Sequence, residues 1–417
     1  MANVRTILAA TACVVGGGPA GVMVGLLLAR AGVEVVVLEK HADFLRDFRD
    51  DTVHPSTLDV LAEISLAERF LELPHRKVHT IGFVDDGSEF DVADFRRLGL
   101  RYPYIAFVPQ WDLLDLLASE ASRYPNFRLL MRSQAYGLLR ENGRVVGVRY
   151  RDPYGEHEIR SCLTVGADGR RSTVRRAARL RLREFGAPMD VVMFRISRHH
   201  TDPDEGYHLR MASGRTVVVI NRTTYWNVSY MTRNGGHEQL RNRGVETLKA
   251  DVARLVPFLA DRVHELTGLE DTRLLQVRVN RAQRWHVPGL LLIGDAAHAM
   301  SPIGGIGINL AVQDAVAAAN LLAEHLIRAQ RHGTPIPESV TAAVQRRRWL
   351  PTVTTQALQR LAQRFAIERS LQGGIPPGYR TIAKSRLMQT LLSRLIGVGV
   401  RPEHVRTPLM SNSRDDP

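Results

Sequence analysis

The sequence predicts an α/β protein in which a nucleotide-binding domain is interrupted by a mostly antiparallel sheet and followed by C-terminal helices. Two apolar, strand-like segments, Thr6–Val15 and Leu290–Ile293, each lead into a glycine-rich turn and then into a helix. Between about Arg183 and Arg278, short strand-like segments replace this pattern. We therefore expect the chain to leave its first domain for a second one and then to return.

The composition is typical of a globular protein with two or three domains. The 417 residues are 44% hydrophobic and 24% charged, and only two are cysteines, both in apolar strand-like runs. A disulfide framework is not expected, and a reducing cytoplasm fits this cysteine usage. The net charge is +13, but 52 of the 56 basic residues are arginine, a bias that indicates genomic base composition. We find no nucleic-acid-binding motif and expect no nucleic-acid partner.

The N-terminal segment predicts a nucleotide site rather than a membrane span or a signal peptide. Ile7–Ala29 contains no charge, but Gly16–Gly18 and Pro19 would break a helix at its centre. A strand, a turn and a helix explain every residue. Gly16, Gly18 and Gly21 match the spacing G-x-G-x-x-G, which lets a backbone turn approach a pyrophosphate.

Glu39 ends the second strand, Val33–Leu38, and stands 18 residues after Gly21. A carboxylate at this point can accept both ribose hydroxyls of an adenosine. Since the acid is Glu and no arginine follows it, the ribose is expected to lack a 2′-phosphate. The sequence therefore favours FAD or NAD over NADP here.

Further elements follow in order. Pro55 opens a helix to about Phe70, Trp111–Ser122 is a second helix, and Asn142-Gly143 turns a hairpin. The strand His157–Val165 ends at Gly166-Ala167-Asp168-Gly169. Arg170–Arg183 then carries seven arginines in fourteen residues. A solvated helix face is the simpler interpretation, and attraction of an anionic cofactor such as NADPH is the alternative.

The interrupting sheet and the C-terminal helices are predicted from their patterns. One helix, about Gly244–Leu255, lies among the strands. Helices are predicted at Leu310–Arg328 and Glu338–Trp349, with a break at Pro351, and at Thr354–Arg369 and Thr381–Ile396. The segment Arg380–Ile396 is amphipathic and basic. We expect it to pack on the protein's own core, with a membrane-surface or dimer contact as the alternative. The predicted strands are Met189–Ser197, Tyr207–Met211, Arg215–Asn221, Trp226–Met231 and Arg273–Val279.

The stretch Gly294–Asp314 combines an Asp at a strand end, Pro302, three further glycines and a helix start near Asn309. Backbone N–H groups at such a helix start favour negative charge. A reduced flavin carries negative charge at the pyrimidine end of its ring. We therefore hypothesise that this stretch holds the reactive ring of a flavin.

These motifs together resemble the class A flavoprotein monooxygenases, the para-hydroxybenzoate hydroxylase-like group, over residues 10 to 350. The resemblance implies an FAD-binding Rossmann-like domain of the glutathione-reductase type, with an inserted substrate-binding sheet. We assign residues 1–80, 100–182 and 279–350 to the FAD domain, 81–99 and 183–278 to the sheet domain, and 351–417 to a helical segment. Asp50 departs from the family pattern, where glycine is usual, and adds a charge near the cofactor.

The resemblance also assigns roles to individual residues. Arg49 would reach the FAD and the nicotinamide region, and Pro302 would border the flavin ring. Asp295 would accept the ribityl hydroxyls, and Ile308 and Asn309 would donate backbone N–H groups to the pyrimidine carbonyl. The expected cofactor-binding set is Gly16, Gly18, Ala20, Glu39, Lys40, Arg49, Gln110, Ala135, Asp168, Asp295, Gly307, Ile308 and Asn309.

The implied activity is hydroxylation of an aromatic or polyketide-like molecule. NADPH or NADH would reduce FAD, O2 would give C4a-hydroperoxyflavin, and its distal oxygen would pass to the substrate. A reductase or dehydrogenase of the same fold, without oxygen insertion, is the alternative. A halogenase is disfavoured because we find no Trp-x-Trp-x-Ile segment. The candidates for substrate contact, which alternate in direction along their strands, are Arg195, Asn221, Tyr225, Trp226 and Tyr230.

No metal is expected, because His199-His200 has no obvious partner ligands. His298 follows Asp295-Ala296-Ala297 as a regular part of the signature, and we interpret it as structural. The expected partners are a small aromatic or polycyclic substrate, O2 and NAD(P)H. We expect no integral membrane span, and either a monomer or a homodimer.

Overall fold

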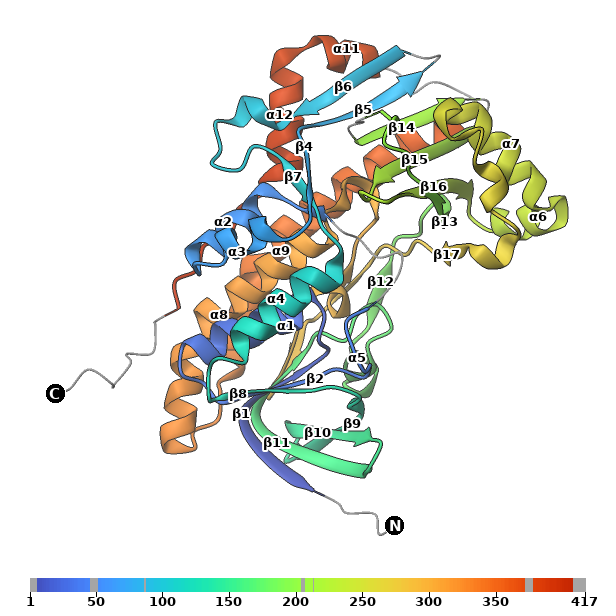
Figure 1. Cartoon of the computed structure of the whole chain (residues 1–417). Coiled ribbons are helices and arrows are strands. Elements are labelled where there is room, and N and C mark those ends of the chain that lie inside the picture. Colours follow the sequence, from blue (N-terminus) through green and yellow to red (C-terminus); the bar gives the residue numbers. More distant parts are fainter. Residues whose placement is uncertain are drawn as a thin grey trace.

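The computed structural model describes residues 6–45, 52–85, 88–203, 207–212, 214–371 and 378–407. Its first sheet is mixed, with parallel strands in the order β20-β11-β1-β2-β8 and three antiparallel additions (Figure 1). Strand β19 pairs with β20 at one edge, and the β9–β10 hairpin continues from β11. These strands are β1 Ile7–Val15, β2 Val35–Leu38, β8 Phe127–Leu130, β9 Gln134–Glu141, β10 Arg144–Asp152, β11 Gly155–Gly166, β19 His286–Val287 and β20 Leu290–Leu292.

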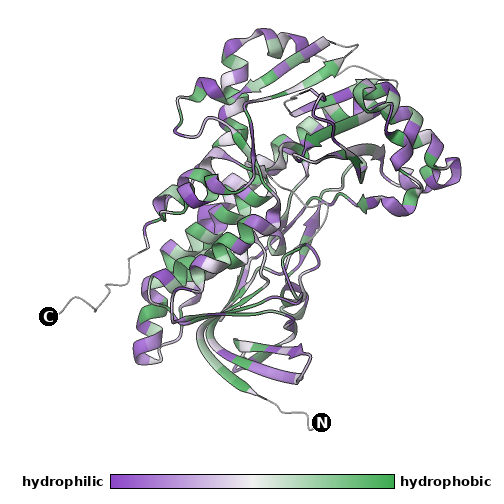
Figure 2. Cartoon of the chain, in the orientation of Figure 1, coloured by the Kyte–Doolittle hydropathy of each residue, from purple (hydrophilic) through white to green (hydrophobic). Residues whose placement is uncertain are grey.

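The central strands of this sheet are buried on both faces, which is why β1 is an almost unbroken apolar run. The helices α1 (Pro19–Arg30), α4 (Gln110–Ala121) and α8 (Gly307–His332) form one continuous core with one face. The other face packs under the β9–β10 hairpin, α5 (Thr173–Ala177) and Trp285. In Figure 2 the central strands β1 and β2 are mostly hydrophobic, whereas α6 (Gly236–Arg243) is mostly hydrophilic.

A second sheet of seven strands has the order β17-β13-β16-β15-β14-β5-β6. All its pairings are antiparallel except that of β14 with β5. The helices α6 and α7 (Val245–Leu255) cover its outer face (Figure 1). These strands are β5 Thr80–Asp85, β6 Ser88–Asp94, β13 Met189–Ser197, β14 Tyr207–Ala212, β15 Arg215–Asn221, β16 Tyr225–Arg233 and β17 Arg273–Leu275.

Short strands and helices join the two sheets. One three-stranded sheet contains β12, β18 and β21, and another contains β3, β7 and β4. Their bounds are β3 Thr52–Val53, β4 Arg76–Val78, β7 Ile105–Phe107, β12 Leu182–Glu184, β18 Asn280–Ala282 and β21 His298–Ala299. The remaining helices are α2 Pro55–Glu63, α3 Ala67–Glu72, α9 Glu338–Ala362, α10 Arg369–Leu371, α11 Tyr379–Lys384 and α12 Arg386–Gly397, with the 3₁₀ turns η1 Phe95–Leu98, η5 Gly294–Ala296 and η6 Ile303–Gly305.

The fold class is confirmed, but three predicted helices have wrong boundaries. The expected helix from Pro55 to about Phe70 is two helices, α2 and α3, because the chain turns at Ser65, whose φ is +62°. Helix α9 continues through Pro351, because Arg348 and Thr352 on either side are buried and packing holds the helix despite the missing N–H. The expected helix Thr381–Ile396 is instead two helices, because the side chain of Ser385 accepts a hydrogen bond from Met388 N and starts α12 anew.

One segment among the described residues, Ile303–His332, is long and apolar enough to cross a membrane. However, 83% of its most apolar window is buried inside the molecule. It packs between α1, α9 and the first sheet, so its composition is that of a core helix.

Candidate functional site

The turn between β1 and α1 is shaped to receive a phosphate group. Gly16 has φ +111°, and a Cβ there would lie 2.4 Å from Ala167 O, so only glycine fits. A Cβ on Gly21 would lie 1.8 Å from Gly16 O. By contrast, nothing lies within 4 Å of a Cβ placed on Gly18, which leaves open space at the start of α1. No described side chain caps α1, so its first N–H groups are available to an anion.

Glu39 stands at the end of β2, where its buried carboxylate is held by the backbone. Gly17 N donates to Oε2 at 2.9 Å, and His41 N donates to Oε1 at 3.0 Å. A carboxylate oxygen can accept more than one hydrogen bond. The side chain is therefore oriented beside the glycine turn, where it can accept ribose hydroxyls.

The loop after β11 packs against the glycine turn at Gly16. Asp168 Oδ2 accepts from Thr173 N at 2.6 Å and from Val174 N at 3.1 Å. Burial raises the pKa of Asp168, whereas these hydrogen bonds act in the opposite direction. Its position directly beside Gly16 and its backbone contacts give Asp168 a supporting role for the turn.

The turn after β20 meets the start of α1 at Gly294. This residue has φ +58°, and its Cβ would lie 3.0 Å from Ala20 Cβ and 3.6 Å from Ala311 Cβ. Gly294 therefore brings the starts of α1 and α8 together. The next residue, Asp295, is partly exposed, and its Oδ2 accepts from Arg170 Nε at 3.1 Å.

A buried charge network fixes this junction. Asp314 on α8 accepts from Gly294 N at 3.0 Å, from His298 Nε2 at 2.6 Å and from Arg348 Nε at 2.9 Å. Burial alone would raise the pKa of Asp314, but His298 and Arg348 outweigh it and hold the pKa below its ordinary value. Arg348 also contacts Glu403 at 3.4 Å, so the C-terminal segment is tied to the site.

The loop from Pro302 to Gly307 leads into α8. Gly304 and Gly305 have φ +76° and +61°, and a Cβ on Gly305 would lie 2.2 Å from Thr52 Oγ1. Asn309 is buried, and its Oδ1 accepts from Ser56 Oγ at 2.9 Å and from Thr57 Oγ1 at 2.6 Å. No described side chain caps α8, so the N–H groups near Gly307 are available to a second anionic group.

The other expected cofactor residues fall in different settings. Gln110 is buried as the first residue of α4, Ala135 is buried on β9, and Lys40 is exposed after Glu39. Arg49 lies outside the described residues. Its expected role at the FAD and nicotinamide therefore stays a prediction.

The second sheet divides the candidates for substrate contact between its two faces. Met193, Leu209, Val218 and Met231 form one cluster with Ile303, the neighbour of Pro302, so this inner face is turned to the flavin loop. Arg195 and Tyr225 alternate onto the same face, with the guanidinium 4.7 Å from the ring centre.

Three candidates require correction, because they alternate onto the outer face with Val219, under α7. Trp226 Nε1 donates to Asp202 Oδ2 at 2.8 Å, and Tyr230 OH donates to Asp251 Oδ2 at 2.7 Å. Asn221 pairs opposite Trp226 on this face and accepts from Thr223 N at 2.9 Å. Their polar atoms are occupied away from the flavin loop.

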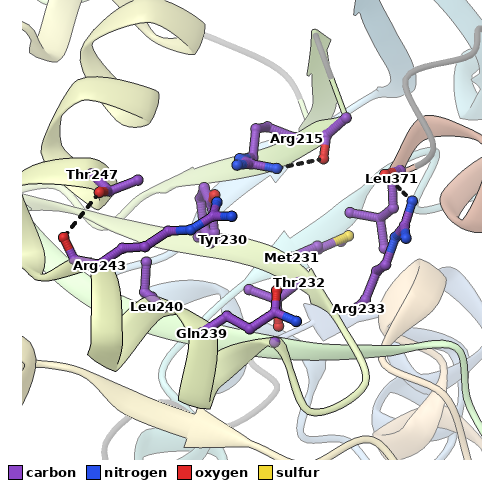
Figure 3. A pocket seen from close by; sticks show the side chains of 12 residues that line it. Arg215, Tyr230, Met231, Thr232, Arg233, Gln239, Leu240, Arg243, Thr247 and Leu371 are labelled. Carbon is purple, nitrogen blue, oxygen red and sulfur yellow. Dashed lines mark hydrogen bonds between the residues drawn. The ribbon is translucent and has the colours of Figure 1, made fainter.

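A cavity of about 210 Å³ lies at the ends of β15 and β16, beside α6 (Figure 3). Arg233 on its wall donates to Leu371 O at 3.2 Å, and Arg215 pairs with Asp251 at 2.8 Å. Two of its arginines are thus bonded to the protein itself. Its lining includes none of the glycine-turn, Asp295 or Pro302 residues, so it is separate from the cofactor site.

Sequence reasoning missed several residues that build the site. Arg175, expected on a solvated face, is buried and donates to Ala296 O and Arg170 O at 2.8 Å each. Arg348 gave no sequence signal, because its partner Asp314 is 34 residues away in the chain. His298 was interpreted as structural, and its ring bonds only Asp314 among described residues.

Taken together, the described residues fit an FAD. Two uncapped helix starts border Gly294, the space above Gly18 is open, and carboxylates flank the line between them at Glu39 and Asp295. FAD has an anionic pyrophosphate at its middle, a ring at one end that gains negative charge on reduction, and hydroxyls on its ribose and ribityl chain. These groups suit the observed N–H donors and carboxylate acceptors.

Comparisons with known proteins agree with this geometry. A family model described as "FAD binding domain" matches residues 9–334. The chain is 33% identical over 321 residues to the 6-methylpretetramide 4-monooxygenase of Streptomyces rimosus, covering 76% of each. It is 32% identical over 310 residues to the rifampicin monooxygenase of Streptomyces venezuelae, covering 72% of this chain and 61% of that one.

Among solved structures, PqsL of Pseudomonas aeruginosa in complex with 2-aminobenzoylacetate has the same fold. The TM-score is 0.75 at 19% identity, and the match covers 90% of this chain and all (100%) of PqsL. The family model covers most of the chain, and the 33% identical relative matches over 76% of this chain. The chain therefore belongs to the FAD-binding domain family, and it is an FAD-dependent monooxygenase of class A.

Proposed function

We propose that this enzyme uses NADPH or NADH and O2 to hydroxylate a polycyclic aromatic or polyketide-like molecule. The observation that carries the proposal is the junction at Gly294, where the pyrophosphate turn and the flavin loop meet. Relatives named for 6-methylpretetramide and rifampicin support a large, fused-ring substrate. Bound FAD would supply the electron transfer from the nicotinamide and the transfer of one oxygen atom.

The chain's own groups would bind and orient the cofactor. The N–H groups at the start of α1 would hold the pyrophosphate, Glu39 the adenosine ribose and Asp295 the ribityl chain. The N–H groups of Ile308 and Asn309 would face the pyrimidine carbonyl, where negative charge develops on reduction. Asp295 must exchange its contact with Arg170 for ribityl hydroxyls, or share it with them.

The substrate would lie between Pro302 and the inner face of the second sheet. This face is apolar around Met193 and Met231, which suits a polycyclic ring system and excludes water from the reacting atoms. Arg195 and Tyr225 supply a cationic and an aromatic contact at its edge. The proposed domain division keeps residues 81–99 and 183–278 as the substrate-binding unit, and a cytoplasmic location belongs to the same proposal.

The test is to supply purified holoenzyme with NADPH or NADH, isotopically labelled O2 and a panel of polycyclic phenols. We expect one substrate class to accelerate flavin reduction and to gain one labelled oxygen atom. Substrate reduced or dehydrogenated without label would instead establish the reductase alternative. NAD(P)H oxidation that yields only hydrogen peroxide with every panel member would contradict the proposed substrate class.

A further inference from the structure

Helix α12 is oriented with its polar side towards the protein. Gln389 Nε2 donates to Asp91 O at 2.8 Å and to Ala383 O at 2.7 Å. Ser393 is fully buried and accepts from Asp94 N at 2.7 Å. Gly397 faces Phe95, which a Cβ would approach at 3.0 Å. These three residues follow one another at every fourth position, so they define the buried side of the helix.

The apolar side of α12 is correspondingly turned outward. Leu387 is 69% exposed, Leu391 is 53% exposed and Met388 is 40% exposed. Only Leu392 and Ile396, at the margin of this side, pack on the protein's own apolar core. The expectation that the apolar face packs on the core is therefore wrong for its central residues. Large aliphatic side chains gathered on one turn of a surface helix mark an interaction site.

Every charged side chain in the segment that contains α12 is positive. Between Glu368 and Glu403 the sequence contains no acidic residue and six basic ones. Arg386 and Arg394, both exposed, lie at the two ends of α12, and exposed Lys384 precedes it. Two of the three acids on the neighbouring strand β6 have basic partners, since Asp94 pairs with Arg96 and Arg97 and Asp91 pairs with His208, and the third, Glu89, lies near the start of the strand.

We propose that the face formed by Leu387, Met388 and Leu391 docks on an anionic lipid bilayer. An interfacial helix inserts its apolar side among the acyl chains, while its basic residues meet the lipid phosphates. A second copy of the chain is a poorer occupant, because it would bring the same basic residues face to face. Helix α12 also lies at the end of the molecule opposite β1 (Figure 1).

The C-terminal end of α12 is joined to the flavin loop and the start of α8 by two side chains. Ser56 Oγ lies 3.2 Å from Gly397 O and 2.9 Å from Asn309 Oδ1. His54 Nδ1 lies 2.9 Å from Ile396 O at the end of α12, and its Nε2 lies 3.1 Å from Gly305 O. Docking through α12 would therefore place the proposed cofactor site close to the lipid surface. An apolar polycyclic substrate dissolved in the bilayer would have a short path to it.

The test measures sedimentation of the full-length holoenzyme with vesicles of phosphatidylcholine, with and without phosphatidylglycerol. We expect partition into the anionic vesicles to be about tenfold stronger and to fall with added salt, because attraction per basic residue is screened. The double variant L387S/L391S should lose on the order of tenfold in partition, because its apolar insertion is removed. Bound-FAD absorbance verifies that each protein is folded and loaded.

The matched control is L350S/L361S, which changes two leucines of similar exposure, 57% and 52%, on α9. It should sediment like the unmodified enzyme. The proposal is overturned if the unmodified enzyme stays in solution with anionic vesicles, or if L387S/L391S partitions as well as the control. It is also overturned if L387S/L391S abolishes a dimer in analytical ultracentrifugation while no vesicle binding occurs. None of these readouts depends on the substrate, so the proposed oxygenation is tested separately.

Discussion

Replacing Arg348 with Met tests whether the buried charge network supports the cofactor site. In the enzyme, Arg348 and Asp314 are both inaccessible, and their 2.9 Å contact is backed by the one from Arg348 to Glu403. Removing one partner of a buried pair leaves an uncompensated charge and costs about 3–5 kcal/mol. The neighbouring Arg347 also pairs with Glu403 at 2.8 Å, but its side chain is partly exposed. R347M should therefore cost only about 0–1 kcal/mol.

Two assays measure the effect of R348M. The apparent Tm should fall by roughly 3–6 °C, since each kcal/mol corresponds to about 1 °C in a protein of 417 residues. The affinity for FAD should also fall by about tenfold, because Asp314 holds Gly294, the residue before Asp295, in place. Equal Tm and FAD affinity in R348M and R347M would refute the reasoning.

The pH dependence of R348M supplies a further check on the sign. The folded-state pKa of Asp314 is lowered below its usual 3.8, so its stabilisation is present above about pH 4 and is lost as the pH falls. Without Arg348, His298 alone opposes the effect of burial, so the pKa of Asp314 rises from its lowered value and protonation relieves part of the unpaired charge. The Tm difference between R348M and the unmodified enzyme should shrink from pH 7 towards pH 5. A constant difference would show that packing, rather than charge, is lost.

Three further outcomes are expected. G18A should leave the Tm of the FAD-free protein unchanged but weaken FAD binding by about tenfold, because its Cβ meets only the ligand. G21A should instead destabilise the FAD-free protein itself. Equal effects of the two variants would contradict the turn geometry. Y230F should cost about 1 kcal/mol of stability without changing KM, because Tyr230 lies on the outer face of the sheet. R195Q, on the inner face, should raise KM. Steady-state kinetics and a Tm measurement on both variants test this assignment of faces. Hydrogen bonds from Arg262 hold the pKa of Asp202 far below its ordinary value, so the stability contributed by this carboxylate is lost as the pH falls. In D202N the Tm should therefore fall less on acidification than in the unmodified enzyme. An unchanged fall of Tm between pH 7 and pH 3 would argue against this.

Local patterns predicted the parts of the site that are local in sequence. The glycine turn, Glu39 and the Gly294–Asn309 stretch each combine a strand end with a helix start, and their roles depend on neighbours a few residues away. The fold class followed from the same patterns. Sequence alone could not place Arg348 or Glu403. Arg348 bonds to Asp314 from 34 residues away, Glu403 bonds to Arg348 from 55 residues away, and no periodicity marks either residue.

The substrate face was the least predictable part of the chain. Alternation along β16 predicts that Tyr225 and Trp226 point oppositely, but not which of them faces the flavin loop. That choice depends on where α7 and Ile303 pack, which is a property of the tertiary structure. The orientation of α12 was predicted wrongly for a related reason, because an amphipathic pattern does not say which side of a helix is buried. In α12 the buried residues are Gln389, Ser393 and Gly397, which are polar or small.

The central position of β11 has a consequence for how the enzyme is synthesised. Strand β20 completes the parallel sheet only after a gap of more than 120 residues, because β11 ends at Gly166 and β20 begins at Leu290. Closing so long a loop is slow, and the inserted sheet has to collapse within it. A nascent chain that ends before β20 has the glycine turn but neither Gly294 nor its anchor Asp314. On the ribosome, FAD should therefore join this enzyme late, after most of the chain has emerged, and the half-built cofactor site must be kept from aggregating until then.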